Sequence, residues 1–251
     1  MRLLFLSMFL FTFMLPARAA ESIELPEYAW TFSGPLGKFD QNQMQRGFQI
    51  YREVCSTCHS LSFIAFRNLG DLGYNEDEIK AIASSYEIKD GPNDAGEMFT
   101  RPGRPSDHFP DPFPNRKAAE AANNGAYPPD LSLMTKARHG GADYLKALLM
   151  GYTEAPAGFD LAGGQYYNRF MPGHRIAMAA PLLDGAVDYK DGSPNTLDQY
   201  TTDIAAFLTW TAEPYMIQRK ETGLRVMLYV AFMTFIFYLN YRLVKRRVKG
   251  A

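Results

Sequence analysis

Cysteine is almost absent from this chain, which has two such residues, Cys55 and Cys58, among 251. Because they lie only three positions apart, no framework of disulfides can brace the fold. Histidine is nearly as scarce, with four residues. No internal repeat and no low-complexity tract is visible. The two thiols are therefore free to serve one local site.

Acidic residues are missing from both ends of the chain. The segment before Ala20 carries two arginines and no acid, and the segment after Thr222 carries six basic residues and no acid. Since the formal net charge of the whole chain is −1, the stretch between these two segments has a net charge of about −9. An acidic domain argues against a nucleic-acid partner and suits a basic protein partner, although acidity also keeps a domain soluble.

The two cysteines belong to the stretch Cys55-Ser56-Thr57-Cys58-His59, which is the attachment pattern for a c-type haem. Each thiol can add to a vinyl group of the porphyrin, and His59 is then placed beneath the iron as its proximal ligand. A thioredoxin-like pair has the same cysteine spacing, but no strand–turn–helix pattern surrounds it. A zinc site would have to recruit His108, His139 and His174, which do not have finger spacing. The sequence therefore predicts one covalently attached haem c.

Residues 1–20 have the composition of a secretory signal peptide. Arg2 precedes an apolar run from Leu3 to Leu15, and the small residues of Ala17-Arg18-Ala19 follow as a cleavage site. The run is short for a membrane span, and an uncleaved anchor is the alternative. Bacteria attach haem covalently outside the cytoplasmic membrane, so this signal would deliver the chain to the compartment where its motif is used.

A second apolar segment lies near the other end of the chain. Residues 226–244 are almost all apolar or aromatic, and about 20 such residues cross roughly 30 Å of hydrocarbon. Basic residues of the segment 245–249 follow directly, which by the positive-inside rule places the C-terminus in the cytoplasm. A buried core helix is the alternative. We expect a periplasmic haem domain over residues 21–213 and a single-pass anchor over residues 214–251 in the bacterial inner membrane.

Capping residues and apolar spacing predict a mainly α haem domain. Asp40 caps a helix that carries the haem motif at its C-terminal end. Asn75 caps a helix from about Glu76 to Tyr86, and Thr196 caps another through Trp210. Three short helices are expected between residues 116 and 150. Residues 89–115 and 152–195 are rich in Pro and Gly, and we expect long loops that wrap the haem.

The second axial ligand of the iron is less determined, because the chain has 12 methionines. A methionine raises the reduction potential, a second histidine lowers it, and an open position favours oxygen or substrate chemistry. Met134 and Met150 lie at helical spacing, which is typical of core packing. Met178 lies in a loop among three small alanines, so it can approach a flat ring closely. The residues alone leave Met178 an open choice, with His174 as a competing candidate.

Three further stretches are long enough to be specific. They are Asp90-Gly-Pro-Asn-Asp-Ala-Gly-Glu-Met-Phe-Thr-Arg-Pro-Gly103, Ala122-Asn-Asn-Gly-Ala-Tyr-Pro-Pro-Asp-Leu-Ser132 and Ala137-Arg-His-Gly-Gly141. Together with the haem motif and the C-terminal span, they resemble the cytochrome c1 family over essentially the whole mature chain. That family supplies the haem subunit of the ubiquinol–cytochrome c oxidoreductase (cytochrome bc1) complex. One departure is visible, since no cysteine beyond the haem pair is present to form a disulfide that braces a loop.

The resemblance implies a fold and a set of site residues. The domain would be a class I cytochrome c-like domain with long loops. The sixth iron ligand would lie in a Met-Ala-x-Pro loop, which in this chain begins at Met178. Arg138 and Tyr144 would bond the haem propionates, and Pro129 would pack against the ring.

The resemblance also implies partners. A mobile Rieske iron–sulfur protein would reduce the haem, a cytochrome c would accept the electron, and cytochrome b would carry out the quinol chemistry beside the membrane helix. The chain would be an electron-transfer subunit and not a catalyst alone. One alternative is a membrane-tethered cytochrome that serves a different oxidase or reductase. Another is a membrane-anchored thiol oxidoreductase that uses Cys55 and Cys58.

Overall fold

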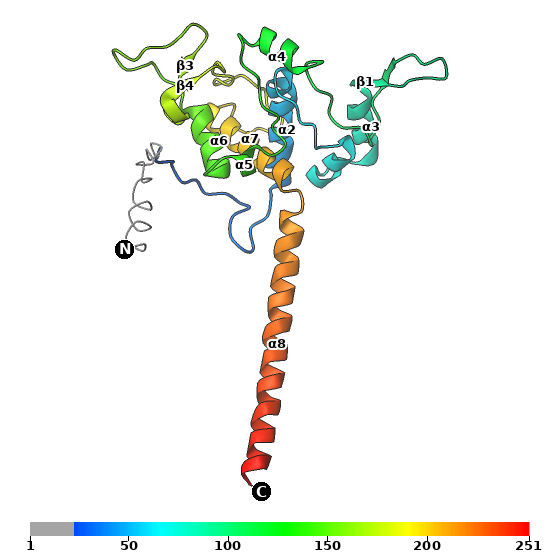
Figure 1. The fold of residues 1–251 in the computed structure, drawn as a ribbon, viewed down its shortest axis with the longest axis vertical. Coiled ribbons are helices and arrows are strands. Elements are labelled where there is room, and N and C mark those ends of the chain that lie inside the picture. The colour runs from blue at the N-terminus through cyan, green and yellow to red at the C-terminus, as the bar shows by residue number, and fades with distance from the viewer. Residues whose placement is uncertain (1–22, 251) are drawn as a thin grey trace, which may run out of the picture.

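Helices α2 (Gln41–Glu53) and α7 (Leu197–Ala212) pack against each other at the centre of the domain (Figure 1). This computed structural model describes residues 23–250, so the predicted signal peptide lies outside the described residues. Gly47 permits the close contact, because a Cβ at this position would lie 2.3 Å from the backbone oxygen of Asp203. The lack of a side chain on α2 therefore lets the two helix backbones approach.

An aromatic cluster fills the contact between the two helices. The rings of Phe48 and Tyr51 on α2 lie 5.9 and 6.0 Å from the ring of Phe207 on α7. Phe109 joins the cluster at 5.9 Å from Phe48. All four side chains are buried. Apolar residues at helical spacing thus bury one face of each helix, as the sequence predicts.

The predicted helix starts are confirmed by their capping bonds. The side chains of Asp40 and Thr196 each accept from the backbone amide three residues later, at 2.8 and 3.4 Å. Asn75 and Glu78 form a reciprocal capping box, with bonds of 3.0 and 2.8 Å. Helix α3 (Glu76–Ser84) ends two residues earlier than predicted.

Three short helices follow in the predicted region: α4 (Arg116–Ala122), α5 (Met134–Ala137) and α6 (Gly141–Met150). Helices α5 and α6 both pack against α7. Met134 is buried in the core as predicted, but Met150 is 38% exposed. The prediction of core packing is wrong for Met150, because this residue ends α6 beyond the face that meets α7. The 3-10 helices η1 (Cys55–Thr57), η2 (Phe66–Leu72) and η3 (Pro172–His174) complete the helical elements in the described part of the chain.

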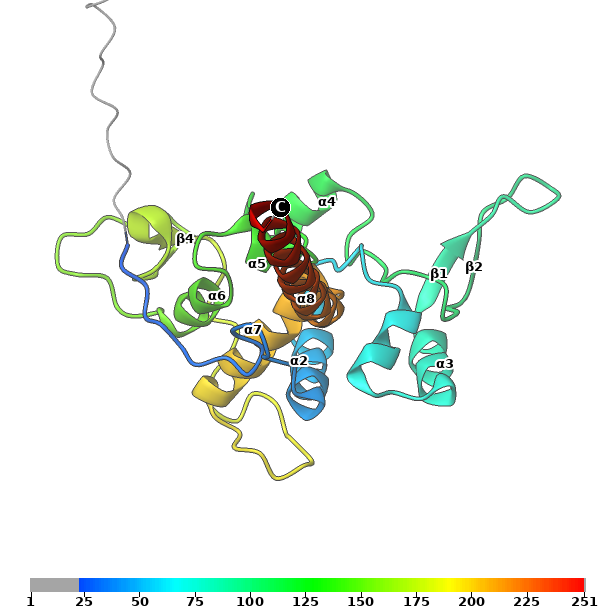
Figure 2. The ribbon, with the colours of Figure 1, turned by 90° about the horizontal axis from the view of Figure 1, so that it is seen from below.

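The two predicted loops are partly ordered as hairpins, which the sequence analysis missed. Strand β1 (Glu87–Asp90) pairs antiparallel with β2 (Phe99–Pro102), and β3 (Tyr166–Tyr167) pairs with β4 (Arg175–Ile176). The first hairpin projects from the domain beside α3 (Figure 2). Arg101 stabilises its base, because its guanidinium pairs with Asp90 at 2.5 Å and with Asp107 at 2.6 Å.

Helix α8 (Met216–Lys249) extends away from the domain as a single rod (Figure 1). It is long and apolar enough to cross a membrane, and none of its apolar window is buried inside the protein. This exposure excludes the alternative of a buried core helix. The prediction of a mainly α fold with one C-terminal span is therefore confirmed.

Ion pairs connect the base of α8 to the domain. Glu213, between α7 and α8, pairs with Lys136 of α5 at 2.9 Å and with Arg219 of α8 at 2.5 Å. Lys220 donates to the backbone oxygen of Phe32 at 2.5 Å. The first turns of the membrane helix are thus held against two separate parts of the haem domain.

Candidate haem-attachment site

The cysteine motif forms a tight turn directly after α2. The sequence predicts that the helix includes the motif at its C-terminal end. Helix α2 instead ends at Glu53, two residues before Cys55. The backbone amides of Cys58 and His59 both donate to the oxygen of Cys55, at 3.1 and 2.9 Å. This turn gathers two free, half-buried thiols and one imidazole within five consecutive residues.

The ring of His59 is oriented by a residue 70 positions away. Its Nδ1 lies 2.8 Å from the backbone oxygen of Pro129. A carbonyl oxygen only accepts hydrogen bonds, so Nδ1 must carry the proton and donate. Burial lowers the pKa of His59, more than the Pro129 carbonyl and Asp130 raise it. The ring is therefore neutral near pH 7, and its Nε2 lone pair is available to a metal.

This donor set fits a c-type haem better than the two alternatives. Burial raises the pKa of the Cys55 thiol to about 12, whereas a redox-active thiol needs a lowered pKa. Among residues 23–250 no group of three or more Cys, His, Asp or Glu side chains could hold a metal ion, which argues against zinc. Two thiols beside one directed imidazole are what covalent haem attachment requires.

The other histidines have partners that account for them. His174 places its Nδ1 3.2 Å from the backbone oxygen of Asn168, and its ring stacks on Tyr167 at 5.4 Å. His108 places its Nδ1 2.7 Å from the backbone oxygen of Ser62. His139 is exposed. The Nδ1 contacts of His108 and His174 leave Nε2 free, as in His59, so His59 is distinguished by its place beside the two thiols.

Met178 lies in the loop after β4 and is half-buried. The hydroxyl of Tyr152 donates to its backbone oxygen at 3.1 Å, which fixes the loop at this residue. A second loop methionine, Met171, lies seven residues earlier, and its sulfur accepts from the hydroxyl of Tyr144 at 3.7 Å. No motif in the sequence marks Met171.

Arg138 and Tyr144 lie near each other on either side of the double glycine before α6. Tyr144 is buried, which raises its pKa, and the neighbouring guanidinium of Arg138 partly opposes this shift. Arg138 itself is exposed and donates to the backbone oxygen of Ala137 at 3.1 Å. The exposed guanidinium suits carboxylates such as propionates, whereas the buried Tyr144 hydroxyl donates to the sulfur of Met171.

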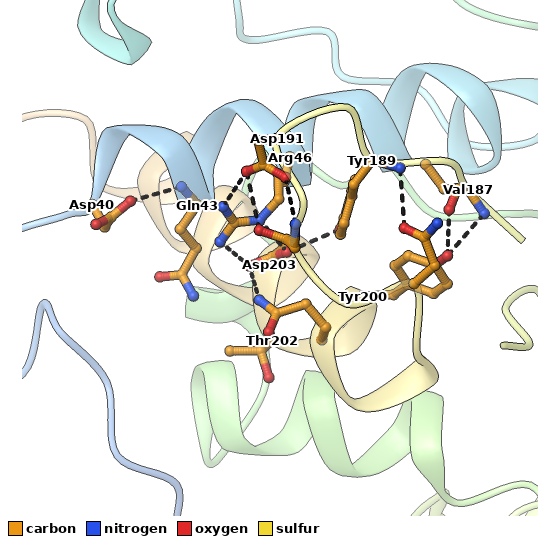
Figure 3. Close-up of polar contacts among 12 residues, drawn as sticks. Asp40, Gln43, Arg46, Val187, Tyr189, Asp191, Tyr200, Thr202 and Asp203 are labelled. Carbon is orange, nitrogen blue, oxygen red and sulfur yellow. Dashed lines mark hydrogen bonds and ion pairs between the residues drawn. The ribbon is translucent and has the colours of Figure 1, made fainter. Parts of the chain in front are cut away.

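A polar network connects α2, which ends just before the motif, to the chain that follows Met178 (Figure 3). Arg46 of α2 bonds Asp203 of α7 and Asp191 of the loop, each at 2.8 Å. The hydroxyl of Tyr189 donates to Asp203 at 2.9 Å. The hydroxyl of Tyr200 bonds both the amide and the oxygen of Val187. Through these contacts, α2 and the loop after Met178 are both held against α7.

Comparison with known proteins decides the family. The model described as "Cytochrome C1 family" matches residues 30–248. The chain belongs to the cytochrome c1 family. It is 51% identical over 207 residues to cytochrome c1-2 of Solanum tuberosum, covering 82% of this chain and 80% of the relative. It is 46% identical over 228 residues to cytochrome c1 of Rhodospirillum rubrum, covering 84% of each.

A third relative is a larger protein. Cytochrome b/c1 of Bradyrhizobium diazoefficiens is 49% identical over 247 residues, covering 89% of this chain. The chain spans only 36% of that relative's length.

Family membership confirms the cofactor prediction. Cytochrome c1 proteins carry one covalently bound haem c and serve electron transport in the respiratory chain as the haem subunit of the bc1 complex. In this chain Cys55 and Cys58 stand at the attachment positions, with His59 next to them. The apolar α8 fits a single-pass membrane-anchored protein.

Proposed function

We propose that this member of the cytochrome c1 family receives electrons one at a time from a Rieske iron–sulfur protein and passes them to a cytochrome c. The proposal is carried by one observation, the bond from His59 Nδ1 to the Pro129 oxygen beside two free thiols. This bond leaves Nε2 of His59 free to bind iron. It also fixes the position of the ring in a domain that is attached to a membrane helix. No group in this arrangement points to bond chemistry on a substrate.

The chain's own residues have separable roles in this proposal. The bound haem supplies a one-electron Fe(III)/Fe(II) couple. Cys55 and Cys58 would tether it, and His59 through Nε2 and Met178 through its sulfur would bind the iron. The thioether ligand and a dry pocket favour a high potential.

Three further residues hold the edges of the group. Arg138 and Tyr144 would bind the propionates, and Pro129 would pack against the ring, while its oxygen orients His59.

The proposed topology places the haem domain, residues 21–213, in the periplasm of a bacterial inner membrane. Residues 214–251 form the anchor and end in the cytoplasm, since basic residues gather after residue 244. Cytochrome b lies beside α8, whose apolar side chains have no cover within the described chain. The Rieske protein and the acceptor cytochrome meet the domain outside the membrane.

The direct test uses the full chain purified in mild detergent with its companion subunits. We expect a reduced-minus-oxidised spectrum of a c-type haem, a haem-stained band under denaturing conditions, and cytochrome b in the same fraction. Ubiquinol should reduce the haem, and extraction of the Rieske protein should abolish that reduction. A stained band without cytochrome b would favour a tethered cytochrome of another oxidase or reductase. An unstained band would leave a thiol oxidoreductase.

A further inference from the structure

Asp130 directly follows Pro129, and its carboxylate accepts four hydrogen bonds. Oδ2 accepts from the hydroxyls of Ser60 and Ser62, both at 2.7 Å, and from the amide of Ser62 at 2.9 Å. Oδ1 accepts from the amide of Ser132 at 2.7 Å. All four partners donate, so the group is held in its acceptor-only, ionised form.

These bonds join two segments that flank the contact between His59 and Pro129. Ser60 and Ser62 follow His59, whereas Ser132 follows Pro129. Two further hydrogen bonds connect the same segments. The amide of Leu131 donates to the backbone oxygen of Ser60 at 2.9 Å, and the amide of Phe63 donates to the hydroxyl of Ser132 at 3.1 Å. The two segments therefore cannot separate without breaking several bonds at once.

The oxygen that accepts from His59 belongs to the peptide group between Pro129 and Asp130. Its direction depends on how the chain is held on both sides of that peptide. The proline ring restricts rotation on one side. The clamped carboxylate of Asp130 restricts it on the other.

We propose that Asp130 is a positioning residue for the proximal histidine, and that its fixed negative charge lowers the potential of the haem iron. It acts through Ser60 and Ser62 to keep the Pro129 oxygen on His59 Nδ1. The inference rests on the proposed role of His59 as proximal ligand.

Both effects have the same sign. A strong bond from Nδ1 increases the basicity of the imidazole, which stabilises Fe(III) relative to Fe(II). A nearby anion does the same. Removing the anion should therefore raise the reduction potential.

The test compares Asp130→Asn with Asp111→Asn in the full chain purified with its haem. Asp111 is a matched control, because its Oδ1 lies 3.0 Å from the same Ser62 hydroxyl, whose single proton is shared with the closer Asp130, but it is exposed and does not adjoin Pro129. We expect Asp130→Asn to keep the haem and to shift the Fe(II)/Fe(III) ratio at fixed potential by roughly three- to tenfold toward Fe(II). Tenfold corresponds to about 59 mV for one electron. Asp111→Asn should shift the ratio by less than about twofold.

A second readout reports on position alone. In the reduced protein labelled with ¹⁵N-histidine, exchange of the His59 Nδ1 proton with solvent should be at least tenfold faster in Asp130→Asn than in Asp111→Asn. Ser60→Ala and Ser62→Ala keep the charge and weaken the clamp, so they should speed this exchange with a smaller change in potential. If Asp130→Asn does not acquire haem, the two serine variants serve as the test in its place.

The inference is overturned if a haem-loaded Asp130→Asn matches Asp111→Asn in both potential and exchange, or if the serine variants leave the exchange unchanged. A wild-type chain without stained haem would instead refute the proposed function. A gel stained for haem therefore distinguishes failure of the proposed function, which leaves no stained band, from failure of this inference, which is seen only in haem-loaded protein.

Discussion

Arg46 on α2 and Asp203 on α7 form a bidentate ion pair, in which Nε lies 2.8 Å from Oδ2 and Nη2 lies 3.2 Å from Oδ1. The Asp203 side chain has no exposed surface, and the Arg46 side chain is 15% exposed. Gln199 and Tyr189 complete the shell of donors around the carboxylate, each at 2.9 Å. A buried carboxylate that is satisfied in this way is costly to disturb from either side.

Asp203→Ala should therefore destabilise the fold by about 3–5 kcal/mol, because Arg46 and Tyr189 lose a buried partner. Asp191→Ala is the matched control, since Asp191 bonds the same guanidinium at 2.8 Å but is 43% exposed. It should cost about 1 kcal/mol or less. The urea midpoint of the full chain in detergent measures both. Equal losses would show that burial of Asp203 does not matter.

Gly47→Ala should also destabilise the protein, because the new Cβ would lie 2.3 Å from the Asp203 oxygen and 2.5 Å from the Phe207 Cβ. Overpacking of this kind costs about 1–3 kcal/mol, which outweighs the roughly 1 kcal/mol that alanine gains in helix propensity. Gly70→Ala is the control, because its nearest neighbour would be 3.8 Å away. It should stay within about 1 kcal/mol of the parent. A stabilised Gly47→Ala in the same urea titration would contradict the close packing of α2 and α7.

The base of the first hairpin should depend on pH. Hydrogen bonds from Arg101 lower the pKa of Asp107 from 3.8 to about 2. A depressed carboxyl pKa contributes stability above about pH 4, and this contribution disappears as the pH falls through about 2. Asp107→Asn should therefore lower the melting temperature at pH 6 and have little effect near pH 2. A melting-temperature difference of the same size at both pH values would contradict this linkage.

Electron transfer to the acceptor should slow as salt rises. The segment between Ala20 and Thr222 has a net charge of about −9, and acidic surface steers a basic carrier. The rate of cytochrome c reduction by the purified complex should fall steeply between low and physiological ionic strength. A rate independent of ionic strength would show that charge does not guide docking.

Local signals in the sequence were enough to predict the helices and the haem motif. Asp40, Asn75 and Thr196 each have a side chain that caps the helix directly after them, so the information lies within four residues. The haem motif is contiguous for the same reason, since two covalent anchors and one ligand must reach one ring. The C-terminal span could be predicted because a membrane imposes a length and a composition on one continuous segment.

Features that depend on distant partners could not be predicted in this way. The first hairpin lacks the alternating apolar pattern of a strand, and Arg101 stabilises it by pairs with Asp90 and Asp107 that only the folded chain brings together. The bond between His59 and Pro129 spans 70 residues. The family resemblance placed Pro129 near the ring but did not reveal that its oxygen holds the histidine.

The most direct test of the account is the reduction potential of Met178→Leu measured beside Met171→Leu. Both methionines lie in the same loop region, and Met171 already accepts a bond from Tyr144. If His59 and Met178 are the two axial ligands, Met178→Leu keeps its covalent haem, loses on the order of 0.1 V or more of potential, and stops quinol-driven reduction. Met171→Leu should keep a potential close to that of the parent. An unchanged potential in Met178→Leu would contradict the ligand assignment.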